Sequence, residues 1–414
     1  MKVVKVLVVA VVLTAMGSTA VLGASLTSIG VLDPSAPYSL VQAVSADGSY
    51  AVGTSKAVGG IQVPIVWSAS DGLVALPNPS GQNSLAHGVA VGIGSNAGNI
   101  IISGLHENNT THRFYKAPLT NLAGGAWIDT ATAGELGSAG NMRGGTSNDL
   151  RIQPGSDGRW YTAGRRNDTG RNARYRGDPS SGWDGTAVRS VGSVSAYGVN
   201  VGRDNASPSN AFYEGPAVSF GTVPGSTGSR ADGIGISSGF GKSSTSDFDV
   251  QWICGQVQNY NGPGTTFQAF RWKRGDASMT FLGSLAPAGG GDTGNNSSCA
   301  YTVADNGVTA GHSYFGAVGT IPGYYVATVW DTSGTWDTTG APKSVKALLD
   351  AAGVDTSMWS SLTRVYAASD DGKVLAGYGV WAADGSTRGF VAVIPEPATL
   401  ALLTLTLPLL RRRR

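Results

Sequence analysis

The chain repeats a short apolar strand that ends in a small residue followed by glycine. Seven copies occur, and their glycines are separated by 51, 60, 38, 53, 56 and 66 residues. These are Gly53, Gly104, Gly164, Gly202, Gly255, Gly311 and Gly377. A unit with a constant centre and loops of variable length is typical of repeat architectures, in which each unit buries its apolar face against its neighbours.

A turn signal accompanies most of these strands, and its glycine stands four to six residues before the repeat glycine. The pairs at this position are Asp47-Gly48, Asp157-Gly158, Asn306-Gly307 and Asp371-Gly372. Asp-Gly and Asn-Gly between apolar runs are strong hairpin signals, because both residues tolerate the positive φ of a type I′ turn. We therefore expect each unit to open with a tight hairpin.

A third strand follows in each unit and often ends in an aromatic residue. The aromatic positions are Trp67, Tyr115, Tyr175, Tyr213, Trp272, Trp330 and Phe390. A fourth element recurs less faithfully, at residues 218–223 and 279–285. Four strands in about 55 residues are typical of a β-propeller blade.

The two ends of the array match one another. The last unit stops after its third strand, while "LTSIGVL" at residues 26–32 precedes the first hairpin and matches "MTFLGSL" at residues 279–285. An N-terminal strand that completes the last blade would remove exposed sheet edges. The sequence thus predicts an all-β fold, a single β-propeller of seven blades closed by an N-terminal strand, over residues 25–394. A different closed blade count and a β-solenoid or sandwich array are the alternatives.

One helix is expected near the end of the array. Val345, Leu348, Leu349 and Ala352 fall on one helical face, and Gly353 ends the segment.

Composition agrees with short strands and many tight turns, since the chain has 61 glycines and only 14% charged residues. The formal net charge is only +2, and this value includes the four arginines at the very C-terminus. No global basic field exists of the kind that nucleic-acid binding requires, so nucleic acid is not an expected partner.

Residues 1–24 have the order of a secretory signal peptide. Lys2 and Lys5 precede an apolar run at residues 6–15, and small residues follow. Cleavage after Ala20 and cleavage after Ala24 both remain open. The mature protein is expected to lack this segment.

The C-terminal residues 395–414 combine a Pro-Glu-Pro motif, an apolar run and a basic block. The motif is Pro395, Glu396 and Pro397, and the block is Arg411, Arg412, Arg413 and Arg414. This order resembles the PEP-CTERM sorting signal of Gram-negative exopolysaccharide-producing bacteria. The resemblance implies transient insertion in the inner membrane and cleavage by an exosortase-type enzyme. The apolar run is shorter than the roughly 20 residues that span a bilayer, and Pro408 interrupts it.

The repeat units also resemble the HAF-type repeats of exported PEP-CTERM proteins. The resemblance is strongest at residues 26–53, 268–311 and 362–394, for example in "AVSADGSYAVG". It implies a secreted or cell-surface location and no particular activity.

Catalytic and metal-binding patterns are scarce. The four histidines, His87, His106, His112 and His312, are scattered. Turn aspartates such as Asp371 could bind calcium, but their hairpin role already explains them. No cofactor or metal site is predicted. A pair of carboxylates for polysaccharide cleavage is not marked by any motif.

A locally basic segment, residues 143–189, offers a possible glycan-binding surface. Its candidate residues are Trp160, Arg165, Arg166, Arg174 and Trp183. Guanidinium groups pair with carboxylates or sulfates, and we expect the aromatic faces to stack on sugar rings. The alternative is a solvated face, because five aspartates are interleaved with these arginines.

Cys254 and Cys299 are the only cysteines. An exported protein could join them in a disulfide. Cys254 also occupies a repeat position that small residues hold in the other units, which favours a small buried side chain.

Together these features predict an exported surface or extracellular-matrix protein, in which a β-propeller is a non-enzymatic binding or structural module associated with exopolysaccharide. A polysaccharide-degrading enzyme and a protein-adhesion module are the alternatives.

Overall fold

The computed structural model describes residues 23–92, 96–106 and 111–129, a series of strands between residues 142 and 273, and residues 275–285, 297–315, 323–331 and 341–394. This part of the chain is all-β apart from one α-helix and a short 3-10 turn. Its strands form antiparallel sheets, most of them four-stranded, which confirms four strands as the repeat unit.

The sheets follow one another along the chain. The first two contain β2 (Ser39–Val44), β3 (Tyr50–Lys56), β4 (Gln62–Ser68) and β5 (Gly72–Ala75), then β6 (Leu85–Val91), β7 (Asn99–His106), β8 (Thr111–Pro118) and β9 (Ala126–Asp129). The next two contain β10 (Met142–Arg143), β11 (Arg151–Ile152), β12 (Trp160–Arg166), β13 (Asn172–Asp178) and β14 (Gly182–Val188), then β15 (Ser190–Val194), β16 (Asn200–Arg203), β17 (Ala211–Tyr213) and β18 (Val218–Ser219).

Three further sheets complete the described strands. They contain β19 (Gly228–Ile236), β20 (Val250–Gln258), β21 (Phe267–Lys273) and β22 (Thr280–Phe281), then β23 (Ser297–Val303), β24 (Thr309–Phe315), β25 (Tyr324–Trp330) and β26 (Pro342–Ser344). The C-terminal sheet has the order β1 (Ser25–Ser28), β29 (Thr387–Val393), β28 (Val374–Trp381) and β27 (Trp359–Ala368).

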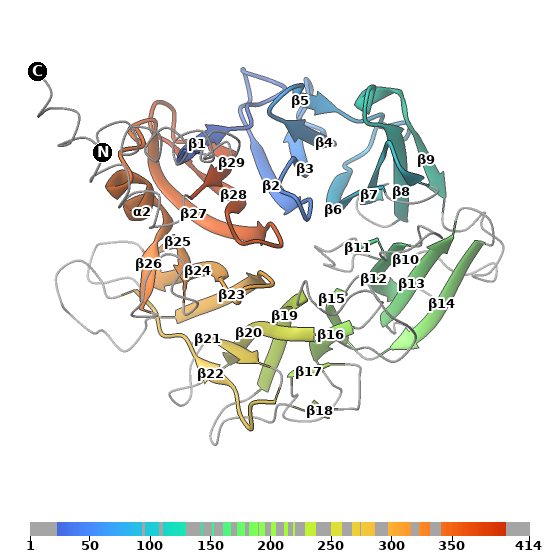
Figure 1. The fold of residues 1–414 in the computed structure, drawn as a ribbon. Coiled ribbons are helices and arrows are strands. Elements are labelled where there is room, and N and C mark those ends of the chain that lie inside the picture. Colours follow the sequence, from blue (N-terminus) through green and yellow to red (C-terminus); the bar gives the residue numbers. More distant parts are fainter. Residues whose placement is uncertain are drawn as a thin grey trace, which may run out of the picture.

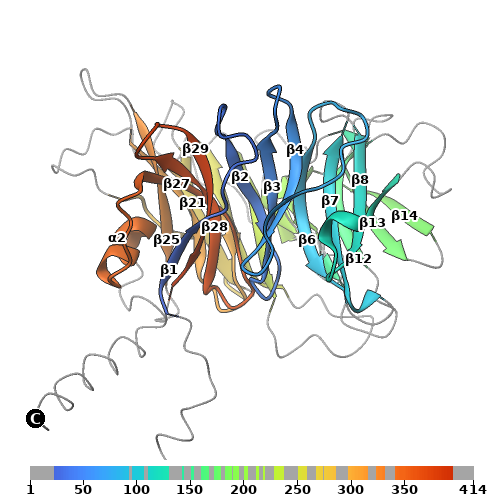
Figure 2. The ribbon, with the colours of Figure 1, turned by 90° about the horizontal axis from the view of Figure 1, so that it is seen from above.

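The sheets stand side by side around a common centre, in a propeller-like arrangement (Figure 1). Strands such as β2, β6, β23 and β27 lie nearest the centre, and the last strands lie at the outside (Figure 1). Figure 2 shows the same sheets from the side. The apolar core lies between neighbouring sheets. One cluster joins Val52 and Val66 to Ile100 and Ile102 of the next sheet.

The repeat glycines lie inside their strands and not at the strand ends, which corrects the expectation from sequence. Gly53 and Gly377, for example, are central in β3 and β28. Six of the seven face a β-bulge in the neighbouring inner strand, on β2, β6, β15, β19, β23 and β27. A Cβ atom on Gly377 would overlap the carbonyl oxygen of Arg364 on the bulged strand. Glycine is needed because the two backbones approach too closely for a side chain.

The hairpin turns occur where predicted but are wider than two-residue type I′ turns. Five residues separate β2 from β3, and five separate β27 from β28. Gly48 adopts a φ of 76°, and its N–H donates to the Ser45 carbonyl at 2.9 Å. The Asp47 carboxylate accepts from Ser45 Oγ at 2.6 Å and from Ser49 Oγ at 2.8 Å. The aspartate therefore stabilises a longer loop through its side chain. The turn at Asp157 lies outside the described residues.

Among the described side chains, most of the third-strand aromatics are buried. Tyr115, Trp330 and Phe390 are completely enclosed. The Tyr115 hydroxyl donates to the Leu122 carbonyl and accepts from the Gly125 N–H, each at 2.8 Å. This ring fills the core while its hydroxyl holds the following turn.

The N-terminal strand pairs with the last strand. β1 lies antiparallel to β29, with Ser25 opposite Val393 and Ser28 opposite Phe390. Ile29 is buried, and its N–H donates to the Gly389 carbonyl at 3.1 Å.

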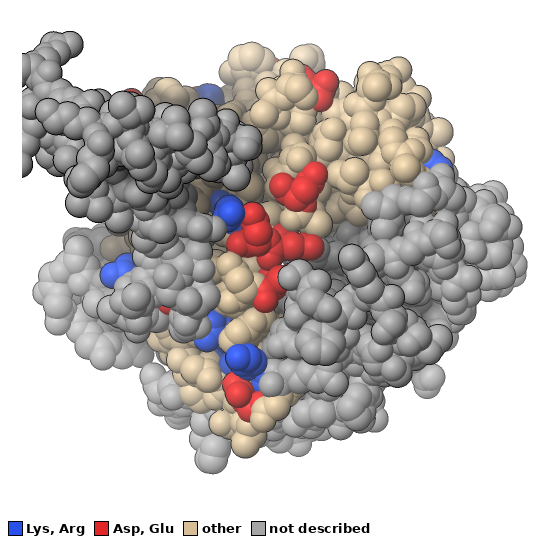
Figure 3. Space-filling model, in the orientation of Figure 1, with Lys and Arg blue, Asp and Glu red and all other residues tan. Residues whose placement is uncertain are grey.

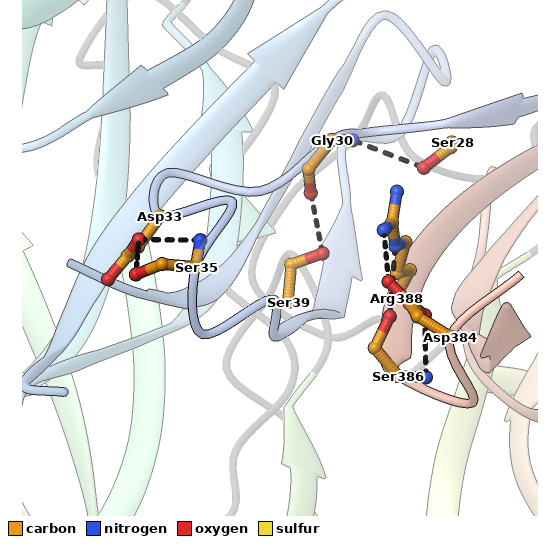
Figure 4. Close-up of polar contacts among 8 residues, drawn as sticks. All are labelled: Ser28, Gly30, Asp33, Ser35, Ser39, Asp384, Ser386 and Arg388. Carbon is orange, nitrogen blue, oxygen red and sulfur yellow. Dashed lines mark hydrogen bonds and ion pairs between the residues drawn. The ribbon is translucent and has the colours of Figure 1, made fainter. Parts of the chain in front are cut away.

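Ser39, which opens β2, also links these segments. Its buried hydroxyl donates to the Gly30 carbonyl at 2.7 Å and accepts from the Gly389 N–H at 3.0 Å. Figure 4 shows Ser39 pointing to Gly30 beside the ion pair of Asp384 and Arg388. The N-terminal segment is thus held by both the C-terminal sheet and the β2–β5 sheet.

The expected helix is present as α2, Val345–Ala351. Ser344 caps its N-terminus by accepting from the Ala347 N–H. Val345 and Leu349 are buried, and Gly353 has a φ of 80° just beyond the C-terminus. Periodicity and the glycine stop identified this helix because both signals are local.

Cys254 and Cys299 are both buried, and within the described residues no disulfide joins them. Cys254 packs with Ala300, Val303 and Trp330 between two sheets. It occupies the core as a small apolar side chain.

The signal-peptide residues 1–22 and the sorting residues 395–414 lie outside the described part of the chain. Among the residues that are described, no helix has both the length and the apolar character to cross a membrane.

Candidate ligand-binding site

Each bulge inserts one extra residue into an inner strand. In the sheets whose side chains are described, the bulge residues beside the repeat glycines are Gln42, His87, Tyr301 and Tyr366, and β27 has two further bulges, at Ser360 and Thr363. Gln42, Tyr301 and Tyr366 are partly exposed, although Val41 and Val365 beside them are buried. A bulge re-aims a side chain out of the regular alternation of a strand. The bulges therefore present chosen side chains on the strands nearest the centre.

Two of these bulge residues belong to a group of rings that we call the tyrosine cluster. Its members are Tyr301, His312, Tyr314, Tyr325, Tyr366 and Tyr378. The ring centroids of Tyr301 and Tyr366 are 5.3 Å apart, and those of Tyr366 and Tyr378 are 5.7 Å apart. The Tyr325 ring is 4.7 Å from Tyr314 and 4.9 Å from His312. The cluster thus connects the β23–β26 sheet with the C-terminal sheet.

Arg364 on β27 provides the positive charge of the cluster. Its Cζ atom lies 4.2 Å from the centroid of the Tyr325 ring, a cation–π arrangement. Its Nη1 donates to the Tyr366 hydroxyl at 3.4 Å, and its buried Nε has no hydrogen-bond partner among the described residues. The ion pairs of the described chain join other residues, and none of them includes Arg364.

Two other members of the cluster, His312 and Tyr378, are held neutral near pH 7. Burial, together with the charge of Arg364, lowers the pKa of His312 to about 3. Burial, together with Tyr366, raises the pKa of Tyr378 to about 12. Burial alone would lower the pKa of Arg364, but the oxygens of Tyr301 and Tyr378 outweigh it and the pKa is raised. The site therefore combines the positive charge of Arg364 with a neutral His312 and a neutral Tyr378 hydroxyl.

Tyr314 and Tyr325 of the cluster lie toward the end of the sheets away from the Asp-Gly and Asn-Gly turns. Tyr314 is near the last residue of β24, which begins just after its turn. Tyr38 precedes β2 at this same end, and the Lys56 Nζ lies 5.3 Å from the centroid of its ring. Tyr324 and Tyr325 are 46% and 36% exposed, and they are among the few large apolar side chains open to solvent in the described part.

The opposite end of the sheets is acidic. Figure 3 shows acidic side chains gathered around the middle of this face. Its turns are linked by backbone hydrogen bonds, from Asp305 N to Asp370 O at 2.8 Å and from Asp370 N to Ala46 O at 2.9 Å. The Asp371 carboxylate accepts from Ser369 Oγ at 2.6 Å. In the described part of the chain, no group of three or more His, Cys, Asp or Glu side chains is arranged to hold a metal ion.

The glycan-binding residues expected from sequence belong to a single sheet. Trp160, Arg165 and Arg166 are on β12, Arg174 is on β13 and Trp183 is on β14. The register places Trp160 opposite Gly177, and Gly177 opposite Trp183. The backbone therefore brings the two tryptophan positions to one rung. The side chains of this sheet, the side chain of His112 and the sorting residues Pro395 to Pro397 and Arg411 to Arg414 lie outside the described residues.

The sequence reasoning missed the tyrosine cluster, although a signal for its centre was available. Tyr301 stands five residues before Asn306, and Tyr366 stands five residues before Asp371. Gln42 has the same spacing to Asp47. The varying residue at this fixed distance from the turn is the bulge residue of the inner strand.

No protein-family model matches the chain, and no curated protein matches it. Several solved structures are distantly similar. A hydrazine synthase of Kuenenia stuttgartiensis has 13% sequence identity and a TM-score of 0.42, and the match covers 84% of this chain and 93% of that chain. A polysaccharide lyase has 10% identity and a TM-score of 0.40, with coverage of 86% and 89%. A lectin of Aleuria aurantia in complex with Fucalpha1-6GlcNAc has 12% identity and a TM-score of 0.33, with coverage of 88% and 97%.

Proposed function

We propose that this chain is an exported surface or extracellular-matrix protein, and that its propeller is a non-enzymatic binding module for exopolysaccharide. The observation that carries the proposal is the tyrosine cluster, a group of partly exposed rings around an arginine that forms no ion pair within the described residues. Its members lie on β23, β24 and β25 of one sheet and on β27 and β28 of its neighbour, and bulges in the two inner strands present two of its rings.

We further propose that the propeller has seven blades and is closed by β1. The pairing of β1 with β29 supports this arrangement, since it gives the C-terminal sheet its fourth strand. A closed ring leaves no inner sheet edge exposed and offers a rigid frame. Rigid support is what a binding site made from two sheets requires.

The chemistry of the cluster suits a sugar polymer. Tyrosine rings are rigid, have an apolar face and carry a hydroxyl that donates and accepts hydrogen bonds. Ligand sites typically combine aromatic walls with a few placed polar groups. Tyr301, Tyr366 and Tyr378 provide such hydroxyls around Arg364, while Tyr325 provides an exposed ring.

Substitution of Tyr325 tests this function. On a glycan array that also monitors bond cleavage, we expect the protein to bind polysaccharide without degrading it, and Tyr325→Ala to weaken binding about tenfold through loss of the exposed ring. Tyr324→Ala is the matched control. Tyr324 is the adjacent residue, is similarly exposed and packs on Phe315 at 5.0 Å, on the other side of the sheet.

The other outcomes separate the alternatives. Release of oligosaccharides would show a polysaccharide-degrading enzyme. Absence of any response to glycans would contradict the proposed function and favour a protein-adhesion module.

Export and processing are a second part of the proposal. The signal peptide would start translocation, the apolar tail would stop in the inner membrane, and the four arginines would remain on the cytoplasmic side. An exosortase-type enzyme would then cut near Pro395 to Pro397. The short apolar run, interrupted by Pro408, suits a transient signal better than a permanent anchor.

Mature protein recovered from the cell surface or medium is therefore expected to lack Arg411 to Arg414. Intact-mass spectrometry measures this directly. The substitution of Glu396 by Ala, which leaves the apolar run and the arginines unchanged, should increase the uncut fraction. Finding Arg414 in most wild-type molecules would mean that the tail is an anchor or has no sorting role.

A further inference from the structure

We infer that the tyrosine cluster recognises an anionic sugar unit, and that Arg364 binds its carboxylate. This inference rests on the proposed function and specifies the chemical class of the glycan. A uronate, in which a carboxylate is attached directly to the sugar ring, provides both groups that the cluster fits.

Arg364 carries a charge that no carboxylate balances within the described residues. A partly buried guanidinium is normally paired with a carboxylate, because removal of an unpaired charge from water is costly. Within the described residues, Arg364 has instead a ring face, one tyrosine hydroxyl and a buried Nε without an acceptor. A bound anion would supply the missing partner.

The donors of Arg364 also have a geometry that suits a carboxylate. Guanidinium is planar and presents paired N–H donors that match the two oxygens of a carboxylate. Arg364 is held in place by the Tyr325 ring at 4.2 Å and by the Tyr366 hydroxyl at 3.4 Å. Both contacts leave donors unused, so the side chain is preorganised for an acceptor.

Several tyrosine rings surround Arg364. Tyr301, Tyr366 and Tyr378 form a continuous series with centroid separations of 5.3 and 5.7 Å. Next to the guanidinium, they offer faces for a sugar ring and hydroxyls for its hydroxyl groups. Within the described residues, the ring contact and the hydrogen bond of Arg364 involve no aspartate or glutamate.

A comparison of binding to three polymers tests this inference separately from the proposed function. Binding to polygalacturonate, to its methyl ester and to dextran sulfate is measured by calorimetry on the full folded chain, at low and at physiological salt. We expect polygalacturonate to bind at least about tenfold more tightly than the ester or dextran sulfate, with a preference that persists at physiological salt.

The variants Arg364→Met and Arg364→Lys test the residue itself. Arg364→Met should lose at least about tenfold of the affinity for polygalacturonate and have a clearly smaller effect on binding of the ester. Arg364→Lys keeps the charge but not the planar pair of donors, so it should recover only part of the loss. Lys273→Gln is the control, since Lys273 is an exposed cation on β21 that contacts the Trp252 ring outside the cluster.

The outcomes are distinguishable. Equal binding of the acid and the ester, with both weakened by Tyr325→Ala, would overturn the inference and leave the proposed function standing. A preference for dextran sulfate would overturn the inference of a carboxylate and would indicate that the site binds a sulfate. Failure to bind any polymer would contradict both proposals. The comparison of wild-type affinities decides the question even if an Arg364 variant folds poorly.

Discussion

Removal of residues 26–32 is expected to destabilise the whole protein and to make it associate. The deletion takes away β1, exposes the backbone of β29 and removes Ile29 from the core between the first and last sheets. Loss of one buried isoleucine typically costs about 2–5 kcal/mol, and the lost strand pairing adds to it. An exposed, flat strand edge also pairs readily with another chain.

Calorimetry and light scattering after size-exclusion chromatography measure the two effects. The matched control is a chain that begins at Ser25, which lacks the signal peptide but keeps β1. Ile29→Ala should show an intermediate loss, and Val58→Ala, at a side chain that is 85% exposed, should show none. A deletion variant that stayed monomeric and melted with the control would contradict closure by β1.

Gly377→Ala is expected to destabilise the protein by about 3 kcal/mol, a large effect for one methyl group. The added Cβ would overlap the Arg364 carbonyl and press on Val365, both in the bulged strand. Neither backbone can move without loss of the register that presents Tyr366. The variant should therefore also weaken glycan binding.

Gly385→Ala is the control for this substitution. Gly385 has a φ of 69°, and a Cβ atom added there would meet no neighbouring atom within 4 Å, so alanine causes backbone strain of about 1 kcal/mol without a collision. Urea unfolding compares the two variants. Equal losses would show that the close approach at the bulge is unimportant.

Features encoded by local patterns could be predicted from the sequence. The repeated glycines, the turn pairs and the aromatic strand ends located the strands, and the spacing of Val345 and Leu349 located α2. The N-terminal strand was found because residues 26–32 resemble a fourth strand elsewhere in the chain. Each of these signals is contained in a short segment.

Features that depend on two strands could not be predicted in the same way. The bulges arise from the register between neighbouring strands, so the role of Gly377 became clear only when Arg364 was seen beside it. The tyrosine cluster combines Tyr301, Tyr325 and Arg364 from separate strands of two sheets. The density of charge along the sequence points instead to residues 143–189.

The pairing of β1 with β29 also determines how the protein responds to force. Ser25 and Val393 are opposite one another, at the positions where the chain enters and leaves the sheet. Tension between the two ends therefore peels the pair open one rung at a time, beginning at Ser25, and does not shear all rungs together. If a polymer binds at the tyrosine cluster as proposed, tension between it and an attachment beyond Val393 would act through the longer pairings of β27, β28 and β29 and would not load β1.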